Sequence, residues 1–378
     1  MTHAPTEALA PATAPTRAAT VAHINRIGTA VPGHDVHEAF IRFARDLLPD
    51  GKSRAVFDRM ADRSGIAHRF SHFRPGDPGE AGAALVDADG FYRRGAFPST
   101  GARMALYAER SVELALRACA ALDLSGERVT HLVVASCTGF TAPGLDQIIA
   151  DRLGLGGALE RTLVGFMGCY AAVPALRLAH QAVRSDPASR VLVVNLELCT
   201  LHLQETPDLE TILSFLLFGD GASAALVTAE PHGIALRDFR AATLPGTADL
   251  ITWRIGDQGF DMHLSGQVPK RIAAALRAER ARNDDGGFLR GERVEDVALW
   301  AVHAGGRTVL DGVEQGLELP AHALDHSRAV LHDYGNMSSA TIMFVLARML
   351  ERERGPAPGV AMAFGPGLTA ETFRFARV

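Results

Sequence analysis

Two long runs of β-branched and aliphatic residues constrain the fold of this chain more than any other feature. HLVVASCTG begins at His131 and RVLVVNLELCT begins at Arg190, and each passes from apolar residues to small or polar ones. Runs of this kind are typical of parallel strands whose two faces are both covered by helices. The pattern predicts an α/β fold, in which ligands bind beyond the carboxyl ends of the strands.

The segment LVGFMGCYAAVPALRLAH lies between these runs, from Leu163 to His180. We expect an apolar strand, a turn carrying Cys169 and then an apolar helix, with Pro174 in the first turn, where a Pro costs little. A thiol at or next to a helix N-terminus has a lowered pKa, which favours a nucleophilic thiolate. The alternative is a small buried hydrophobe, the usual fate of a free Cys.

The other thiols leave the same two interpretations open. Cys137 and Cys199 follow the two strand runs, so they either line a cavity or pack in the core. Cys119 falls inside a helical pattern and is expected in the core. With no CxxC pair, no HExxH and no His/Cys cluster among 15 His, the sequence indicates free thiols in a reducing compartment and no metal site.

Composition excludes several other classes of protein. The chain has 378 residues, 47% hydrophobic content and a net charge of −5 spread along its length, so we expect two domains or one duplicated domain and no nucleic-acid partner. Residues 1–20 are rich in Ala, Pro and Thr and predict a disordered tail without a secretory signal. No apolar stretch reaches membrane-spanning length, which favours a cytoplasmic protein.

Strand and helix patterns alternate through the whole chain. Helical patterns occupy residues 37–48, 53–65 and 100–124, and the second of these carries Arg54, Arg59 and Arg63 on one face, either a solvated charged face or a phosphate-binding edge. Residues 298–319 repeat the strand, small-residue turn and helix of the first half. Residues 327–350 are expected to do so again, and residues 358–375 to close the fold as a strand pair. The pattern predicts a duplicated α/β architecture with halves at 21–230 and 231–378.

Two further polar residues occupy positions like that of Cys169. His303 stands where the run ALWAV stops, and Asn336 opens a strongly apolar helix in YGNMSSA. Taken alone, each has a structural interpretation, a hydrogen-bonded histidine and a helix N-cap. Together with Cys169 they supply what thioester chemistry requires: a nucleophile, a partner that forms a thiolate–imidazolium pair, and N–H donors for a carbonyl or enolate oxygen. The turn in LLFGDGASAALV has a sufficient structural explanation as a hairpin, so Asp220 needs no chemical role.

Taken together, these motifs resemble those of the type III polyketide synthases of the thiolase superfamily, which include the chalcone and stilbene synthases. The resemblance covers residues 21–378 and rests on GFMGCYAA, LFGDGASAALV, VHAGG, GNMSSA and FGPGLTAE. VHAGG, in place of the HQAN of carrier-protein ketoacyl synthases, favours the coenzyme A-dependent members. The resemblance implies a five-layered αβαβα thiolase fold, duplicated within one chain and forming a homodimer.

The resemblance also implies a reaction. A starter acyl-CoA loads Cys169, malonyl-CoA is decarboxylated beside His303 and Asn336, and the enolate extends the chain before it cyclises to a pyrone, resorcinol, phloroglucinol or related product. Acyl-CoA and malonyl-CoA are then substrates, with no bound cofactor. The alternatives are a single-condensation 3-oxoacyl synthase of the same fold and a catalytically silent acyl-CoA-binding protein.

Several other positions match those of the family. Phe218 matches the gatekeeper phenylalanine, and Met262 stands where plant enzymes carry a second one, so a flexible thioether leaves an adaptable wall there. Cys137 resembles bacterial members, including the tetrahydroxynaphthalene synthases. At a third position where the family carries a basic residue, this chain has Val56, and Arg54 stands nearby as a possible substitute. The remaining matches are the cavity residues His202 and Ser338 and the coenzyme A-binding residues Arg59, Arg63, Gly305 and Gly306.

Overall fold

One nine-stranded sheet organises the structure, which is a computed structural model and describes residues 20–76, 86–282 and 284–378. The strand order is β11-β12-β13-β8-β1-β7-β6-β4-β5. The strands are β1 (His23–Ala30), β4 (His131–Ser136), β5 (Glu160–Gly165), β6 (Val191–Leu198), β7 (Asp220–Thr228), β8 (Ile234–Thr243), β11 (Leu299–Val302), β12 (Ala357–Gly365) and β13 (Thr369–Arg377). The tail predicted for residues 1–20 lies, except for Thr20, outside the described residues.

The two halves of the chain repeat one strand arrangement. In the first half β4 runs parallel to β6, β6 antiparallel to β7, and β7 antiparallel to β1. In the second half β11 runs parallel to β12, β12 antiparallel to β13, and β13 antiparallel to β8. The halves join where β1 pairs with β8. The predicted duplicated α/β architecture is confirmed by this repeat.

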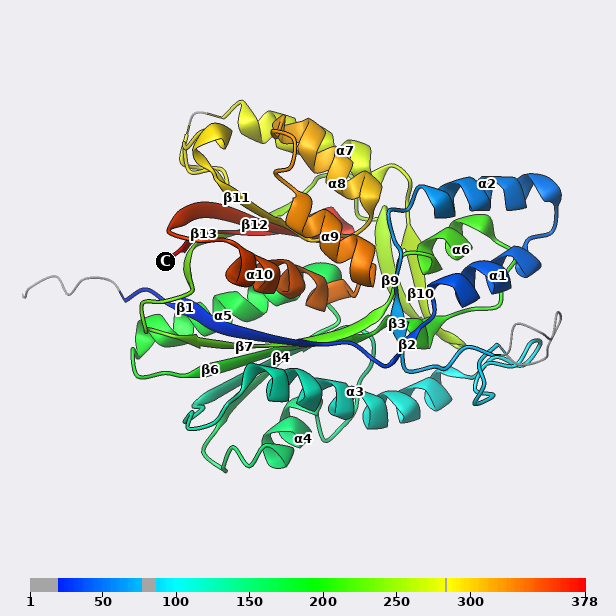
Figure 1. Cartoon of the computed structure of the whole chain (residues 1–378), viewed down its shortest axis with the longest axis horizontal. Coiled ribbons are helices and arrows are strands. Elements are labelled where there is room, and N and C mark those ends of the chain that lie inside the picture. The colour runs from blue at the N-terminus through cyan, green and yellow to red at the C-terminus, as the bar shows by residue number, and fades with distance from the viewer. Residues whose placement is uncertain (1–19, 77–85, 283) are drawn as a thin grey trace, which may run out of the picture.

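Helices cover both outer sides of the two halves and fill the space between them (Figure 1). The outer helices of the first half are α3 (Thr100–Leu122) and α4 (Leu145–Arg152), and those of the second half are α7 (Val268–Arg280) and α8 (Arg307–Leu317). The central helices are α5 (Ala172–Ser185) and α10 (Thr341–Arg352), with α9 (Asp325–Tyr334) beside α10. The layers therefore alternate as αβαβα.

Alternate side chains of each buried strand belong to different cores. Val133 and Ala135 of β4 pack in the central core with α5 and α10, whereas Leu132 and Val134 pack against α3 and α4. In the second half, Trp300 of β11 packs outward in the core of α7 and α8. Strands buried on both faces are the reason that these runs are almost continuously apolar.

A smaller region covers one end of the layers and lies at the right of Figure 1. Its elements are α1 (His37–Leu47), α2 (Gly51–Asp62), α6 (Leu209–Phe215), the hairpin of β9 (Ile251–Gly256) and β10 (Gly259–Leu264), and the short strands β2 (His34–Asp35) and β3 (Phe70–Ser71). The three helices share a core of their own, in which Phe57 and Ile212 are buried.

One predicted element is wrong. The strand expected at the start of residues 327–350 is the helix α9, whose buried residues are Ser327, Val330 and Leu331. Spacings of three and four residues place these side chains on one helix face, whereas a strand would bury alternate residues. The other predicted helices, over 37–48, 53–65 and 100–124, correspond to α1, α2 and α3. Within the described residues, no helix combines the length and apolar character needed to cross a bilayer.

Candidate active site

Cys169 lies in a short turn between β5 and α5. Residues Gly168–Tyr170 form a single 3-10 turn, and α5 begins at Ala172. Gly168 has a φ of +78°, and a Cβ at this position would lie 2.4 Å from the ring of Pro366. Only glycine fits such a turn against the loop that follows β12, so the position of the thiol depends on Gly168.

His303 directly follows β11, and Asn336 follows α9. The backbone N–H of His303 donates to the carbonyl of Met362 at 2.8 Å, and that of Asn336 donates to the carbonyl of Leu217 at 2.8 Å. The side chain of Asn336 is held at both ends: its Nδ2 donates to the Gly305 carbonyl at 3.2 Å, and its Oδ1 accepts from the backbone N–H of Ser338 at 2.9 Å. The amide is therefore fixed beside the loop that carries His303.

Asn336 lies next to the Cys169 thiol and to the loop that carries His303. Its amide can donate to the Cys169 sulfur, and it bonds to the carbonyl of Gly305, two residues after His303. The His303 ring is 2% exposed, and neither of its nitrogens has a hydrogen-bond partner within the described residues. Within the described residues, the Cys169 thiol and the His303 ring form no hydrogen bond with each other. Both imidazole nitrogens are therefore free to engage a thiol or a substrate oxygen.

Burial governs the protonation of this site. It raises the pKa of the Cys169 thiol to about 11, although the Ser338 hydroxyl and the Asn336 amide, which can donate to the sulfur, lower it. Burial also lowers the pKa of His303 to about 3. The expected lowering of the thiol pKa by the start of α5 is thus outweighed. Each group taken separately is neutral at pH 7, so a thiolate requires proton transfer between them.

The Cys169 thiol opens into a mostly apolar cavity. Its lining residues are Cys137, Thr138, Gly168, Cys169, Cys199, His202, Phe215, Phe218, Ile251, Trp253, Met262, Ser338 and Pro366. The cavity thus brings together all five residues predicted from the sequence as gatekeeper or cavity positions, and Cys199 lines it as well. His303 and Asn336 are not among the lining residues.

Trp253 is a cavity residue that the sequence reasoning missed. It stands opposite Met262 across the β9–β10 hairpin, and its Nε1 donates to the carbonyl of Cys137 at 2.8 Å. The indole is therefore fixed in the wall beside the flexible thioether. A signal was present, because Trp253 is one of two Trp in the chain.

Glu197 is a second residue that the sequence reasoning missed. Its buried carboxylate accepts from the Cys137 N–H at 3.0 Å, from the Thr138 hydroxyl at 2.8 Å and from the Ser339 hydroxyl. The Cys137 thiol lies 3.3 Å both from this carboxylate and from the Ser338 hydroxyl. Burial raises the pKa of Glu197. A single carboxylate within the apolar run RVLVVNLELCT could have identified it.

His202 shapes the cavity wall but has no free nitrogen. Its Nε2 donates to the Thr138 carbonyl at 2.7 Å, and its Nδ1 accepts from the Phe260 N–H at 3.0 Å. The ring stacks on that of Phe260 at a centroid distance of 4.1 Å. Burial lowers the pKa of His202 to about 3, so the ring is neutral and fixed.

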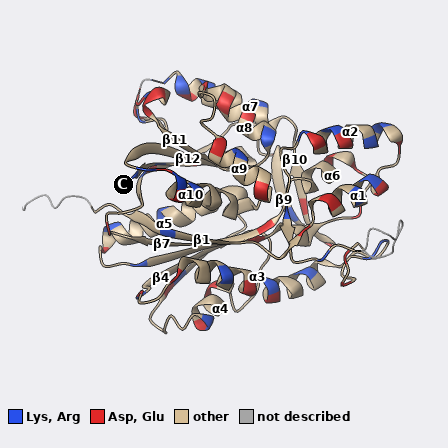
Figure 2. Ribbon diagram, viewed as in Figure 1, with Lys and Arg blue, Asp and Glu red and all other residues tan. Residues whose placement is uncertain are grey.

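The residues matched to coenzyme A binding come from two elements that meet. Arg59 in α2 and Arg63 just after it are exposed, and Figure 2 shows basic residues along this helix. Arg307 follows the Gly305–Gly306 turn and donates to the carbonyl of Arg63 at 3.2 Å, which brings that turn to the end of α2.

Arg54, the substitute expected for the basic group missing at Val56, already makes hydrogen bonds within the chain. Its Nε and Nη2 donate to the Leu48 carbonyl at 3.2 and 3.0 Å, so the guanidinium closes the end of α1.

Asp220 has a structural role, as expected, although it is the first residue of β7 rather than part of a hairpin turn. It accepts from the N–H and the hydroxyl of Thr200 at 2.8 and 2.7 Å.

The described residues contain no group of three or more His, Cys, Asp or Glu side chains that could hold a metal ion.

Two family models match this chain, and they divide it at nearly the same place as its two structural halves. The family model described as chalcone and stilbene synthases, N-terminal domain, matches residues 11–231, and that of the C-terminal domain matches residues 236–378. An alpha-pyrone synthesis polyketide synthase-like protein, Pks18 of Mycobacterium tuberculosis, is 33% identical over 376 residues, which cover 94% of this chain and 91% of that protein. Bisdemethoxycurcumin synthase of Oryza sativa subsp. japonica is 33% identical over 381 residues, or 94% of this chain and 92% of that protein.

A solved structure is similar over the same length. The crystal structure of PKS-I from the brown alga Ectocarpus siliculosus superposes with a TM-score of 0.82 at 31% identity, covering 95% of this chain and 99% of that chain. The thiolase-like fold expected from the sequence is confirmed by this match.

Proposed function

Since the chain belongs to the chalcone and stilbene synthase family and is a type III polyketide synthase, we propose that Cys169, His303 and Asn336 carry out its reaction. Enzymes of this family are malonyl-CoA-dependent acyltransferases. The observation that supports the assignment best is a fixed amide next to both the Cys169 thiol and the loop of His303, a residue whose two buried ring nitrogens have no partner within the described residues.

Acyl loading begins with a proton transfer. His303 accepts the Cys169 proton as the sulfur attacks the carbonyl carbon of the starter acyl-CoA. The bond from that carbon to the coenzyme A sulfur breaks, and coenzyme A leaves as the thiol after it takes the proton from His303. The thiolate–imidazolium pair exists during this step, when the mutual attraction of two buried opposite charges offsets the desolvation of each.

Malonyl-CoA decarboxylation uses the two N–H donors. Loss of CO2 leaves an enolate, whose oxygen accepts hydrogen bonds from neutral His303 and from Asn336. A carboxamide has two N–H bonds. Asn336 spends one on Gly305, and the other, which can donate to the Cys169 sulfur in the free enzyme, turns to the enolate oxygen once that sulfur is acylated. The enolate carbon then attacks the Cys169 thioester and lengthens the chain by two carbons. Because CO2 loss creates the carbanion without a strong base, we propose that no bound cofactor or metal takes part.

The substrates are held at both ends of the site. We assign the coenzyme A phosphates to the exposed side of Arg59 and Arg63, next to the Gly305–Gly306 turn. We assign the growing chain to the cavity of Phe218, Met262 and Trp253. The thioether at position 262 leaves an adaptable wall, which favours an alkyl starter, and the name of the Mycobacterium relative supports a pyrone as product.

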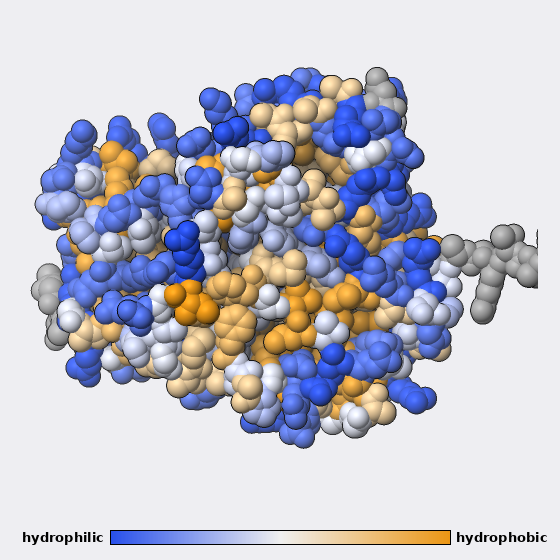
Figure 3. Space-filling model, turned by 180° about the vertical axis from the view of Figure 1, so that it is seen from behind, coloured by the Kyte–Doolittle hydropathy of each residue, from blue (hydrophilic) through white to orange (hydrophobic). Residues whose placement is uncertain are grey.

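We also propose a homodimer that forms along β5. This strand is an edge of the sheet, paired only with β4, and Leu163 within it is 43% exposed. Figure 3 shows apolar surface gathered on the face turned away in Figure 1. An open strand edge favours pairing with a second copy, and the exposed Leu163 adds apolar area to it. Light scattering that gives the mass of a single chain at micromolar concentration would contradict this assembly.

Product identification tests the function. The enzyme is incubated with labelled malonyl-CoA and a panel of acyl-CoAs, with and without a chelator. We expect CO2 release and a cyclised product from at least one starter, no effect of the chelator, and no condensation by the Cys169→Ala variant. A single β-ketoacyl product or dependence on a carrier protein would favour a 3-oxoacyl synthase. No CO2 from any starter would indicate a silent acyl-CoA-binding protein.

A further inference from the structure

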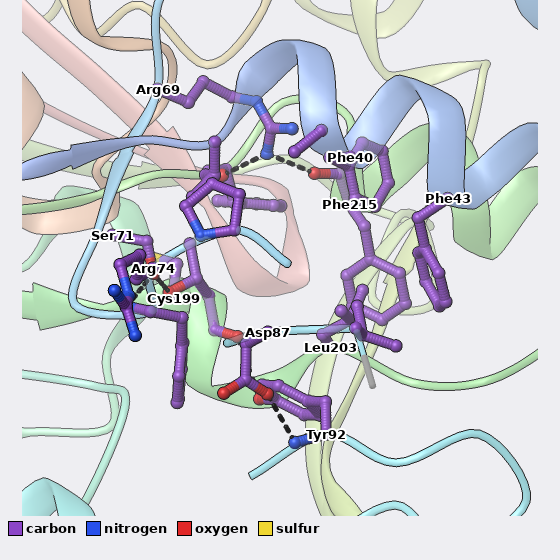
Figure 4. A pocket seen from close by; sticks show the side chains of 17 residues that line it. Phe40, Phe43, Arg69, Ser71, Arg74, Asp87, Tyr92, Cys199, Leu203 and Phe215 are labelled. Carbon is purple, nitrogen blue, oxygen red and sulfur yellow. Dashed lines mark hydrogen bonds between the residues drawn. The ribbon is translucent and has the colours of Figure 1, made fainter. Parts of the chain in front are cut away.

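A second cavity lies across the Phe215–Phe218 segment from the active-site cavity. The two cavities share Cys199, Phe215 and Phe218 as a wall. The other lining residues come from α1 and the residue before it, from β3 and the chain on both sides of it, from the chain before α3, and from the turn after β6: Val36, Ala39, Phe40, Phe43, Arg69, Ser71, Phe73, Arg74, Pro75, Val86, Asp87, Tyr92, Thr200 and Leu203. We call it the Arg69 cavity (Figure 4). It contains neither Arg59 and Arg63 nor the Gly305–Gly306 turn, so it is separate from the coenzyme A site proposed above.

A buried guanidinium forms one end of this cavity. Arg69 is 2% exposed, and its Nη1 donates to the carbonyls of Phe215 and Phe218 at 2.9 and 2.6 Å. Its Nε donates to Nδ1 of His37 at 2.9 Å. Its Nη2 is buried and has no partner within the described residues, and Arg69 makes no ion pair there. Asp35 and Asp220 offset part of the Arg69 charge by Coulomb attraction, but a buried guanidinium nitrogen without a hydrogen-bond partner is still costly, so this end of the cavity favours an anion.

The carboxylates nearest to Arg69 are already engaged. Asp35 accepts from the His68 ring at 2.6 Å and from the backbone N–H of Arg69, and Asp220 accepts from Thr200. Burial raises the pKa of Asp220 to about 7, so its negative charge is incomplete at neutral pH. Burial lowers the pKa of Arg69 only to about 10, so the guanidinium stays charged.

The charged residues in the cavity wall are engaged as well. The Asp87 carboxylate accepts from three backbone N–H groups, those of Asp89, Phe91 and Tyr92, at 2.6 to 3.2 Å. Arg74 is largely exposed, and its Nη2 lies 3.6 Å from Asp89. Among the described lining residues, the Nη2 of Arg69 is therefore the one buried side-chain nitrogen or oxygen without a partner.

Aromatic rings make up much of the remaining wall. The Phe40 ring centroid lies 4.7 Å from the guanidinium carbon of Arg69, and Figure 4 shows Phe40, Phe43 and Phe215 on one side of the cavity and Tyr92 below them. The Tyr92 hydroxyl is already occupied, because it donates to the Thr200 carbonyl at 3.0 Å. Rings of this kind pack well against a flat apolar body by stacking or edge contacts.

We propose that the Arg69 cavity binds a small monocarboxylate with a flat apolar body. Its carboxylate accepts from Nη2 of Arg69, and its body lies among Phe40, Phe43 and Tyr92. Such a ligand lies against the wall that the two cavities share and does not enter the active-site cavity. Arg69 holds the Phe215 and Phe218 carbonyls, and the segment between them accepts from the Asn336 N–H through Leu217.

Calorimetric titration of the full chain with trans-cinnamate tests this site. We expect one bound cinnamate per chain. Cinnamamide, which has the same body without the charge, should bind about tenfold or more weakly, because charge-assisted hydrogen bonds are roughly twice as strong as neutral ones. Octanoate should also bind more weakly, since its flexible chain must be ordered on binding. Equal affinity for cinnamamide would overturn the role of Arg69, and equal affinity for octanoate would overturn the flat-body requirement.

Cinnamate could instead occupy the active-site cavity, so the location needs its own control. Binding should persist in enzyme whose Cys169 has been alkylated with iodoacetamide and which no longer condenses malonyl-CoA. Binding lost on alkylation would move the ligand to the active site and overturn this inference, while the condensing activity of the untreated enzyme would leave the proposed function intact.

Three variants complete the test. Ala39→Leu places three extra carbons in the cavity without touching Arg69, and it should abolish cinnamate binding. Glu38→Leu adds a leucine at an exposed position of the same helix and should bind like the unmodified protein. Arg69→Gln removes the charge and should bind at least about tenfold more weakly. Because Arg69→Gln also loses structural hydrogen bonds, its melting curve is measured. If Arg69→Gln does not fold, the result with Ala39→Leu decides whether the ligand binds in this cavity. Unchanged binding by Ala39→Leu would overturn the proposed location.

Discussion

The two cavities on either side of Phe215 and Phe218 differ in the kind of polar group that they leave free. In the candidate active site the His303 imidazole has no partner within the described residues, and the Cys169 thiol receives hydrogen bonds only from neutral groups; each is neutral at pH 7 when taken separately. In the Arg69 cavity the free group is a permanent positive charge. Neutral groups suit a charge that exists only during a reaction, whereas a fixed charge suits a ligand that carries a permanent opposite charge.

Of the changes predicted here, removal of the Asn336 amide should reduce the rate of reaction in the active-site cavity the most. Asn336→Ala deletes the N–H donor that we propose for the enolate oxygen, and we expect malonyl-CoA decarboxylation to slow by about 10²- to 10³-fold, the usual cost of one such donor. Release of labelled CO2 measures it. The matched control is Asn25→Ala, which removes a buried Asn bonded to Glu230 and His232 away from both cavities. An equal loss in both variants would assign the effect to folding.

The His303 imidazole should decide how Cys169 ionises. Burial raises the pKa of the thiol to about 11 with His303 in place, so only a small fraction is thiolate at pH 7, and we propose that His303 takes the thiol proton as the sulfur reacts. In His303→Gln we expect alkylation of Cys169 by iodoacetamide to be at least about a hundredfold slower than in the unmodified protein at pH 7, and to rise about tenfold per pH unit up to pH 10. Mass spectrometry of the Cys169 peptide follows the rate. Identical pH profiles in the two proteins would mean that His303 does not take the thiol proton.

The wall beside Trp253 should control the size of the starter. Met262→Phe replaces the flexible thioether with a rigid ring in the active-site cavity, and we expect the product ratio to shift about tenfold toward smaller starters, as the loss of a few methylenes of space implies. Ile255→Phe adds a ring at an exposed position of the same hairpin and serves as the control. The idea fails if Met262→Phe keeps the product profile of the parent enzyme.

Asp220 should give the smallest effect. Its pKa is raised to about 7 in the folded chain and is about 4 when unfolded, so the folded state holds its proton more tightly. The Asp220 contribution to stability is therefore present below pH 4 and is lost as the pH rises to 7. Asp220→Asn should flatten the dependence of the unfolding free energy on pH in this window by up to about 1.4 kcal/mol per pH unit. Denaturant titrations at pH 4.5, 5.5 and 6.5 measure it, and parallel curves for the two proteins would show that Asp220 does not titrate there.

Residues at recognisable boundaries of helices and strands could be predicted from the sequence. Cys169, His303 and Asn336 stand at strand ends or helix starts, and these boundaries follow from apolar periodicity and from neighbouring small residues. Glu197 and Trp253 carried weaker signals, because a single unusual residue in a run does not say what it faces. The segment 327–334 was misread because a short apolar stretch suits a strand or a helix equally well, and only packing on α10 separates the two.

The sequence by itself determined the duplicated α/β fold, the family and the three candidate catalytic side chains, since each depends on residue types at short spacings along the chain. Tertiary structure alone decided the protonation of Cys169 and the isolation of the Arg69 charge. Both depend on which groups are excluded from water and which distant carbonyls and carboxylates lie within reach, and desolvation is a property of the packed molecule. Arg69 illustrates this dependence, because the carbonyls that hold it lie about 150 residues further along the chain.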